Sequence, residues 1–370
     1  MDERFESRTR RLQERLGTSD ATGVVLVPSP NLYYLSGFWE EQMERPLLGF
    51  VGESGDPSIV APALYGTQLA DETWIGDVRT YGDGEDPYDL VEAVAADLDL
   101  ADGHLLLDPT MWARFSVELQ RRLSDATVDL AEDLMGDLRI RKDDAEIDAI
   151  RRASRVADAV VSDLREMGES VVGMTEAELA RTIEDRLVEA GGDGLSFDVI
   201  VGSGPNGAKP HHHHSDRRIG AGDPVVLDFG TRVDRYPSDQ TRTLVFGGQP
   251  PEGFDDAFAA VSDAQEAAVQ AVEPGVEAGD IDAIAREVIT ERGYGEQFIH
   301  RTGHGVGLDV HEAPFIVAGS DRTLEPGMVF SVEPGVYVEG EVGIRIEDLV
   351  AVTEDGFERL NRTDRGYGVA

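Results

Sequence analysis

Residues 224–243 read PVVLDFGTRVDRYPSDQTRT. The apolar run 224–229 is typical of a buried strand, yet it carries a carboxylate, Asp228, next to its last residue. The residues that follow, 231–237, predict a hairpin that returns Asp239 beside Asp228. Two carboxylates placed together raise one another's pKa unless a metal ion lies between them. This stretch therefore predicts paired strands that meet at a charged site.

Two more acids stand in or beside apolar strand candidates in the same half of the chain. Glu333 follows the predicted strand 328–332, and Glu347 lies within the predicted strand 343–352. A carboxylate in an apolar strand is expensive to bury unless a cation or a proton compensates it. Taken one at a time, each acid is explained more simply as an ordinary strand-end residue of an acidic protein.

Histidines gather in the same half of the chain. Seven of the eight lie in two segments, 211–214 and 300–311. Oxygen-rich ligand sets suit ions such as Mn²⁺, and one histidine nitrogen widens the choice to Co²⁺, Fe²⁺ or Zn²⁺. Four carboxylates and one imidazole, with bridging acids, suffice for two divalent ions about 3.5–4 Å apart.

The charge balance excludes two classes of partner. The 33 basic and 73 acidic residues give a formal net charge of -40, a field that repels phosphate backbones and anionic lipid headgroups. We therefore expect neither nucleic acid nor membrane as a partner. Lysine occurs only at Lys142 and Lys209, which we interpret as adaptation to concentrated salt, where the Debye length is about 3 Å at 1 M. An ordinary acidic protein is the alternative.

Targeting and redox signals are absent from the sequence. There is no cysteine, so neither a disulfide framework nor thiol chemistry is predicted. The first 16 residues are heavily charged and lack the apolar segment of a signal peptide. No apolar run approaches the ~20 residues of a membrane helix. These features predict a cytoplasmic protein.

A chain of 370 residues exceeds what one core usually organises, so we expect two domains. In residues 1–138, short apolar runs alternate with helical patterns, which predicts an N-terminal α/β domain without a catalytic constellation. Charge density rises at 137–144. In residues 139–370, a capping box at Thr175 and Glu178 predicts a helix, and strands grouped with helices predict an α+β layer architecture.

The motifs become specific when they are taken together. In chain order they are PH at 210–211, LDFG at 227–230, SDQTRT at 238–243, GHGVG at 303–307 leading to HE at 311–312, EPG at 333–335 and GIRIED at 343–348. They resemble the motifs of the M24 metallopeptidase family, the pita-bread enzymes that include methionine aminopeptidase, aminopeptidase P and prolidase. Residues 31–38, NLYYLSGF, are similar to the family's creatinase-like N-terminal domain, so the resemblance covers nearly the entire chain.

The resemblance implies a complete set of metal ligands. The family's ligand positions are filled here by Asp228, Asp239, His304, Glu333 and Glu347. The implied cofactors are two divalent metal ions per chain, Mn²⁺ or Co²⁺ first and Zn²⁺ or Fe²⁺ as alternatives. Metal-free relatives such as creatinase have lost ligands, so a full set favours a metalloenzyme. A homodimer is implied by the resemblance alone.

By resemblance, a second group of residues faces the substrate. His211, His300 and His311 would contact the scissile peptide or stabilise the tetrahedral intermediate. Glu333 would pass a proton to the leaving proline nitrogen. Arg345 stands two residues before Glu347 and would orient that ligand or a substrate carboxylate.

The implied activity is hydrolysis of the peptide bond preceding proline in dipeptides or short peptides, by a metal-bridging hydroxide. Whether the enzyme is an Xaa-Pro dipeptidase or an Xaa-Pro aminopeptidase stays open. One alternative is a dinuclear-metal hydrolase of a small non-peptide amide or solute on the same scaffold. Another is a non-catalytic binding module, against which the intact ligand set argues.

Three features depart from the family pattern. Gln240 stands where the family usually has an aliphatic residue, and we expect it to change packing and not ligation. Phe315 stands where some prolidases have an arginine, which weakens a strict dipeptidase assignment because a buried substrate carboxylate demands a cation. The run His212 to His214 matches no motif, and we expect exposed loop residues with incidental metal affinity.

Overall fold

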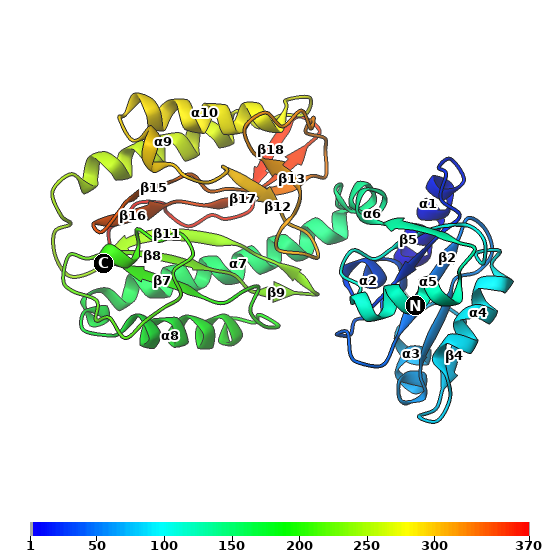
Figure 1. The fold of residues 1–370 in the computed structure, drawn as a ribbon. Coiled ribbons are helices and arrows are strands. Elements are labelled where there is room, and N and C mark those ends of the chain that lie inside the picture. The colour runs from blue at the N-terminus through cyan, green and yellow to red at the C-terminus, as the bar shows by residue number, and fades with distance from the viewer. Residues whose placement is uncertain (1–2, 370) are drawn as a thin grey trace. The chain divides into compact units, whose positions relative to one another are not determined.

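The computed structural model describes residues 3–369. The chain divides into two compact units, Met1–Arg139 and Ile140–Ala370. Figure 1 shows that each unit has its own strands and its own covering helices. Among the described residues, no helix is both long enough and apolar enough to cross a membrane.

The first unit is a mixed sheet covered by helices. Its strands are β1 (Gly23–Leu26), β2 (Leu48–Gly52), β3 (Ser58–Pro62), β4 (Asp77–Tyr81), β5 (His104–Leu107) and β6 (Thr127–Leu130). They form one sheet in the order β4-β3-β2-β1-β5-β6. The helices are α1 (Glu3–Leu16), α2 (Pro30–Ser36), α3 (Gly66–Glu72), α4 (Pro87–Asp97), α5 (Ala113–Arg122) and α6 (Glu132–Arg139). Phe50, Val91 and Phe115 share the buried core between sheet and helices.

The second unit begins with two helices that pack on three strands. These elements are α7 (Asp144–Met167), α8 (Glu176–Glu189), β7 (Ile200–Ser203), β8 (Pro224–Phe229) and β11 (Gln240–Val245). The capping box predicted at Thr175 and Glu178 is confirmed, because each side chain accepts the other residue's backbone N–H. The strands form a sheet in the order β11-β8-β7. Leu164, Ile183 and Leu227 lie in the core that this sheet shares with its helices.

The predicted hairpin is present between β8 and β11. Strand β9 (Arg232–Val233) pairs antiparallel with β10 (Tyr236–Pro237). As a result β11 returns antiparallel to β8, with Thr241 opposite Asp228. The turn thereby brings the chain from the first strand-end acid back to the second.

The rest of the second unit adds another sheet and two more helices. The helices are α9 (Phe254–Gln270) and α10 (Ala278–Glu291), and the strands are β12 (Gly303–Gly305), β13 (Glu312–Ile316), β14 (Val329–Val332), β15 (Gly335–Val338), β16 (Val342–Arg345), β17 (Asp348–Thr353) and β18 (Gly356–Arg359). Five of these strands form a sheet in the order β13-β12-β14-β17-β18. Figure 1 shows the strands of this unit as a layer between α9 and α10 on one side and α7 and α8 on the other. This is the layered α+β architecture that the sequence predicts.

The prediction of one strand over 343–352 is wrong. The segment forms two strands, because β16 pairs with β15 whereas β17 pairs with β14 and β18. Between them, the Glu347 N–H donates to the carbonyl oxygen of Thr241 at 3.1 Å. Glu347 therefore stands where the chain crosses from one strand pair to another sheet, and the apolar pattern does not reveal this crossing.

Candidate metal centre and substrate pocket

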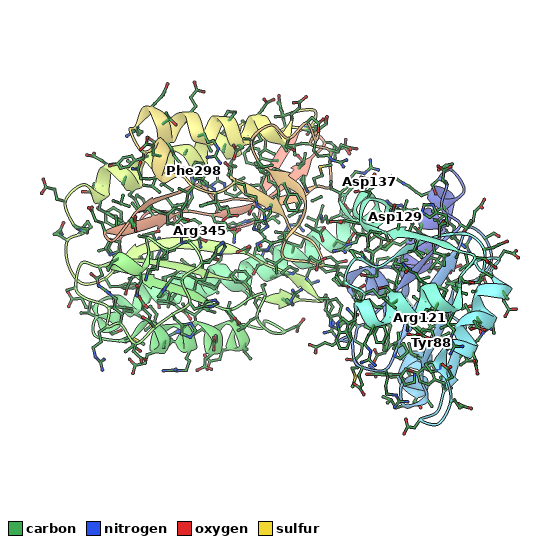
Figure 2. All side chains as sticks on the ribbon, viewed as in Figure 1. Tyr88, Arg121, Asp129, Asp137, Phe298 and Arg345 are labelled. Atoms are coloured by element: carbon green, nitrogen blue, oxygen red, sulfur yellow. The ribbon has the colours of Figure 1, made fainter. Side chains whose placement is uncertain are left out.

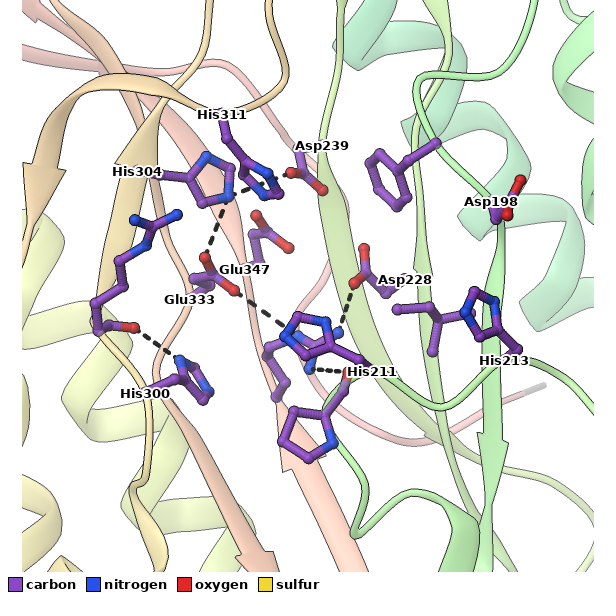
Figure 3. A pocket seen from close by; sticks show the side chains of 15 residues that line it. Asp198, His211, His213, Asp228, Asp239, His300, His304, His311, Glu333 and Glu347 are labelled. Carbon is purple, nitrogen blue, oxygen red and sulfur yellow. Dashed lines mark hydrogen bonds and ion pairs between the residues drawn. The ribbon is translucent and has the colours of Figure 1, made fainter.

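A cavity of about 630 Å³ opens among the strand ends of the second unit. Its walls contain every residue that the sequence predicts for the site, namely Asp228, Asp239, His304, Glu333, Glu347, His211, His300, His311 and Arg345. Figure 3 shows their labelled side chains facing a common space, with His304 and His311 on one side and Asp228 on the other. Segments more than 100 residues apart in the sequence therefore meet at one pocket.

The innermost part of this cavity is a cluster of carboxylates around one imidazole. Single ligand atoms of Asp239, His304 and Glu347 lie within 4.8 Å of one another. The Nε2 atom of His304 is 3.3 Å from Glu333 Oε1 and 3.6 Å from Asp239 Oδ2. Asp228, Asp239, His304 and Glu347 are all buried. Glu333 is the most accessible of the four acids, with 16% of its side chain exposed.

The acids of the cluster are not neutralised by their neighbours. Burial, followed by the charges of the neighbouring carboxylates, raises the pKa of Asp239 and Glu347 well above the ordinary range. Burial also raises the pKa of Asp228, against the opposing charge of Arg345. For Glu333 burial acts upward, but the hydrogen bond with His304 and the nearby cations outweigh it and lower the pKa to about 2. The cluster holds more negative charge than its own cations balance.

Unpaired atoms identify what the cluster lacks. Within residues 3–369, the buried atoms Asp228 Oδ1 and Glu347 Oε1 have no hydrogen-bond partner, and a buried acceptor left unpaired is costly. Both oxygens belong to the predicted ligand set, which offers carboxylate oxygens and one histidine nitrogen. This donor set suits divalent cations of the Mn²⁺, Co²⁺, Fe²⁺ or Zn²⁺ type. The residues present therefore fit the implied metal.

Two further residues, Thr241 and Ser331, hydrogen-bond the predicted ligands from the side away from the cavity. The Thr241 hydroxyl donates to Glu347 Oε2 at 2.6 Å. The Ser331 hydroxyl donates to Glu333 Oε1 at 3.3 Å and accepts the His304 N–H at 3.1 Å. Outer partners of this kind fix the orientation of metal-binding side chains. The signal for Thr241 and Ser331 in the sequence is their place two residues from a predicted ligand along a strand, Asp239 and Glu333 respectively.

Arg345 is committed to orienting the cluster. Figure 2 shows it within the strand layer of the second unit, and its side chain is buried. Its guanidinium donates to Asp228 Oδ2 at 2.5 Å, to Thr241 Oγ1 at 3.1 Å, to the Tyr337 hydroxyl at 2.8 Å and to the Pro210 carbonyl at 3.4 Å. These contacts engage four of its five N–H groups. Arg345 is expected to orient Glu347 or a substrate carboxylate, but its guanidinium holds Asp228 instead and reaches Glu347 through the Thr241 hydroxyl.

The three histidines that we expect on the substrate side differ in how they are held. His300 Nε2 is 2.9 Å from the Tyr337 hydroxyl and its Nδ1 is 2.7 Å from the Arg301 carbonyl, and burial lowers its pKa. The ring of His311 lies edge-on to that of His304, with centroids 4.1 Å apart. Burial, followed by the charges of His304 and Arg301, lowers the pKa of His311 to about 4. His211 is exposed at the cavity wall.

The expectation for His212 to His214 is wrong for His212. Its side chain is only 13% exposed, and Nε2 lies 2.9 Å from Glu176 Oε2. His214 is also half-buried, with Nδ1 3.2 Å from the Val199 carbonyl. His213 is exposed and lines the cavity. The run thus alternates between inward and outward side chains, as an extended segment does.

Glu176 organises the loop that carries these histidines. It is fully buried and accepts hydrogen bonds from both the N–H and the hydroxyl of Ser203 and of Ser215, and from the Asn206 amide. Burial acts to raise its pKa, but these hydrogen bonds and the contact with His212 lower it to about 2. Glu176 therefore joins both ends of the loop 203–215 to the first turn of α8.

Gln240 is fully buried at the start of β11. Its amide nitrogen donates to Asp158 Oδ1 and to the Thr363 hydroxyl, each at 2.9 Å. Its side chain therefore connects this strand to α7 and to the C-terminal segment.

Comparison with known proteins agrees with this geometry. Residues 148–354 match the metallopeptidase family M24, and residues 8–141 match the creatinase/prolidase N-terminal domain. The probable dipeptidase PepE of Mycobacterium tuberculosis is 43% identical over 351 residues, which are 93% of this chain and 91% of the relative. The Xaa-Pro dipeptidase of Pyrococcus horikoshii is 34% identical over 366 residues, with 98% of each chain covered. The crystal structure of recombinant prolidase from Thermococcus sibiricus superposes with a TM-score of 0.94 at 38% identity and covers 100% of both chains.

Proposed function

The chain belongs to metallopeptidase family M24, and on this premise we propose that it hydrolyses the peptide bond preceding proline in short peptides. The observation that carries the proposal is the meeting of four carboxylates and His304 in one cavity, where two carboxylate oxygens find no partner among the described residues. Such a cluster is costly to maintain without cations. The same cavity offers histidines to a bound peptide.

The predicted ligands, Asp228, Asp239, His304, Glu333 and Glu347, would hold two divalent ions, with Mn²⁺ or Co²⁺ as the first candidates. When bound, such ions supply Lewis acidity, which polarises a carbonyl and activates water near neutral pH. Arg345 keeps Asp228 in a fixed orientation, and Thr241 does the same for Glu347. Preorganised ligands of this kind hold metal more tightly than mobile ones.

The remaining residues act on the substrate and its proton. Glu333 is the cluster acid nearest to solvent, so its carboxylate is placed to accept a proton from the attacking water and return it to the proline nitrogen. His311 stands against His304, where its N–H stabilises the oxygen that becomes negative as the carbonyl is attacked. His211 supplies a second such donor from the exposed loop. His300 is held by Tyr337 and positions the peptide.

The test is a turnover assay with defined peptides and metals. Purified chain with added Mn²⁺ or Co²⁺ should release proline from Xaa-Pro dipeptides, and the activity should disappear after chelation and return when metal is restored. Absence of turnover on both dipeptides and Xaa-Pro tripeptides, across several divalent metals, would contradict the proposal. The homodimer expected from the family resemblance predicts twice the mass of one chain in light scattering.

A further inference from the structure

Arg301 lines the cavity but takes no part in the roles assigned above. Its guanidinium carbon lies 4.6 Å from the ring centroid of Phe315, within the range of a cation–π contact. Among residues 3–369, no carboxylate pairs with this guanidinium and no hydrogen bond engages it. A cation without a partner is unexpected in a chain with 73 acidic and 33 basic residues. The Arg301 guanidinium is therefore available to bind an anion that enters the cavity.

The other guanidinium in the cavity belongs to Arg345. It is buried and already donates to Asp228, Thr241 and Tyr337. No lysine lines this part of the structure. Arg301 is half-buried, so its charge is less screened by water than that of an exposed arginine. An anionic group entering the cavity therefore finds one uncommitted cation.

Two neighbouring strands hold Arg301 in place. Its carbonyl oxygen lies 2.7 Å from His300 Nδ1, and the N–H of the next residue, Thr302, donates to Ile316 of β13 at 3.0 Å. Strand β12 pairs with β13 so that His304 stands opposite Phe315. The same pairing that presents His304 to the carboxylate cluster therefore places the Phe315 ring against Arg301.

Resting on the proposed function, we propose that Arg301 binds the free C-terminal carboxylate of the substrate and makes the chain selective for Xaa-Pro dipeptides. In such a dipeptide the proline itself carries the carboxylate, whereas a longer peptide has a neutral amide there. A carboxylate that enters a cavity lined by five acids is repelled unless a cation receives it, and a guanidinium binds it through paired N–H groups. The cation expected in a dipeptidase is then not lost with Phe315, because the Phe315 ring supports Arg301, which lies in the segment that leads into β12.

The experiment compares Ala-Pro with its C-terminal amide in the metal-loaded enzyme. Wild type should cleave Ala-Pro, which has a free carboxylate, with a higher kcat/KM than the amide. In Arg301→Met, kcat/KM for the acid should fall on the order of 10–100-fold through a higher KM, and the acid-to-amide ratio should approach one. Arg301→Lys keeps the charge but not the planar fork, so its ratio should be intermediate. The matched control is Arg114→Met, whose guanidinium stacks on Phe115 at 5.5 Å in the first unit and whose loss should leave the ratio unchanged.

Three results would overturn the assignment: equal cleavage of acid and amide by wild type, equal loss on both in Arg301→Met, or tripeptides cleaved as well as dipeptides. Binding is measured separately from hydrolysis, so that failure of the carboxylate assignment can be told apart from failure of the proposed function. Calorimetry measures the affinity for a dipeptide analogue in which a methylene replaces the scissile carbonyl, and for its C-terminal amide. If no peptide is hydrolysed but the acid analogue binds more tightly than its amide in wild type only, Arg301 is still the carboxylate site. If wild type binds the two analogues equally well, or if Arg301→Met still prefers the acid analogue as strongly as wild type does, the carboxylate assignment fails whatever the turnover.

Discussion

Glu347 and Asp348 are adjacent in the sequence, yet they lie in two buried charge clusters of opposite character. Asp348 receives Arg242 and Arg359, each at 2.7 Å, and the Gln265 amide at 3.2 Å. Glu347 receives the Thr241 hydroxyl on one oxygen, and its other oxygen has no partner in the part of the chain that the structure describes. One cluster is balanced by its own residues and the other is not.

The difference separates a structural charge from a functional one. Arg242 and Asp348 are both about 1% exposed, and such a pair persists because its charges and hydrogen bonds satisfy each other. The Arg242 guanidinium also donates to the Glu347 carbonyl at 2.6 Å, so the balanced cluster fixes the backbone of the unbalanced one. Surplus negative charge held this rigidly indicates a cation site. The residue types alone, a glutamate and an aspartate, do not show which of the two acids belongs to that site.

The largest effect is expected from breaking the unbalanced cluster. Asp239→Ala should abolish peptide hydrolysis because it removes one of the predicted metal ligands. The fold should survive, because the substitution removes a carboxylate that the neighbouring carboxylates repel. Glu333→Ala should behave alike. The measurement is kcat/KM on an Xaa-Pro dipeptide together with the unfolding midpoint. Asp216→Ala, an exposed acid of the His211 loop, is the control, and retained turnover in Asp239→Ala would refute the ligand assignment.

Breaking the balanced cluster should lower the stability of the fold, whereas breaking the unbalanced cluster should abolish activity. Arg242→Met removes one of the two arginines that pair with the buried Asp348. We therefore expect the free energy of unfolding to fall by about 3–5 kcal/mol, with or without metal. Urea denaturation measures it. Arg359→Met removes a partner that is 19% exposed and should cost less. A change below about 1 kcal/mol in Arg242→Met would mean that this pair is not a structural element.

Metal removal sharpens the comparison without a mutation. Because an ion bound only to the folded state stabilises it, Mn²⁺ at 100 times its Kd should add about 2.7 kcal/mol. Chelation should therefore lower the Tm of wild type and leave that of Asp239→Ala much less affected. If chelator and metal change the Tm of wild type and of Asp239→Ala by the same amount, the stabilising ion is bound outside the carboxylate cluster.

A third buried carboxylate, Glu176, is held by hydrogen bonds from Ser203, Asn206 and Ser215 and by its contact with His212. Glu176→Gln should lower the free energy of unfolding by about 1.5–3 kcal/mol. Its pKa of about 2 in the folded chain lies below the ordinary value of 4.5. The stabilisation is therefore complete above about pH 5 and is lost as the pH falls toward 2. The Tm difference between wild type and Glu176→Gln should shrink between pH 7 and pH 3, and a constant difference would contradict this account. KM should also rise, because the loop carrying His211 loosens.

Much of the second unit follows from local sequence. The strand predicted at 224–229 is β8, the hairpin is β9 and β10, and the capping box starts α8. Alternation, turn residues and capping chemistry act over a few residues, so a single sequence carries them. The crossing at Glu347 cannot be recognised in the sequence, because the apolar pattern continues through it.

The contacts that fix the site were harder to predict, because they join residues distant in the chain. Glu176 has the appearance of an ordinary first-turn acid, and its partner Ser215 lies 39 residues away. Arg345 holds the Pro210 carbonyl across 135 residues. Arg301 is part of a motif-rich segment, but only the structure shows that Phe315 is its neighbour. Adaptation to concentrated salt stays a prediction.

The most direct test of the central claim is the metal content of the purified chain. After loading with Mn²⁺ and removal of free ion, elemental analysis should find close to two divalent ions per wild-type chain and clearly fewer in Asp239→Ala. A wild-type chain that retains no divalent ion, or an Asp239→Ala chain that retains as many as wild type, would contradict the account.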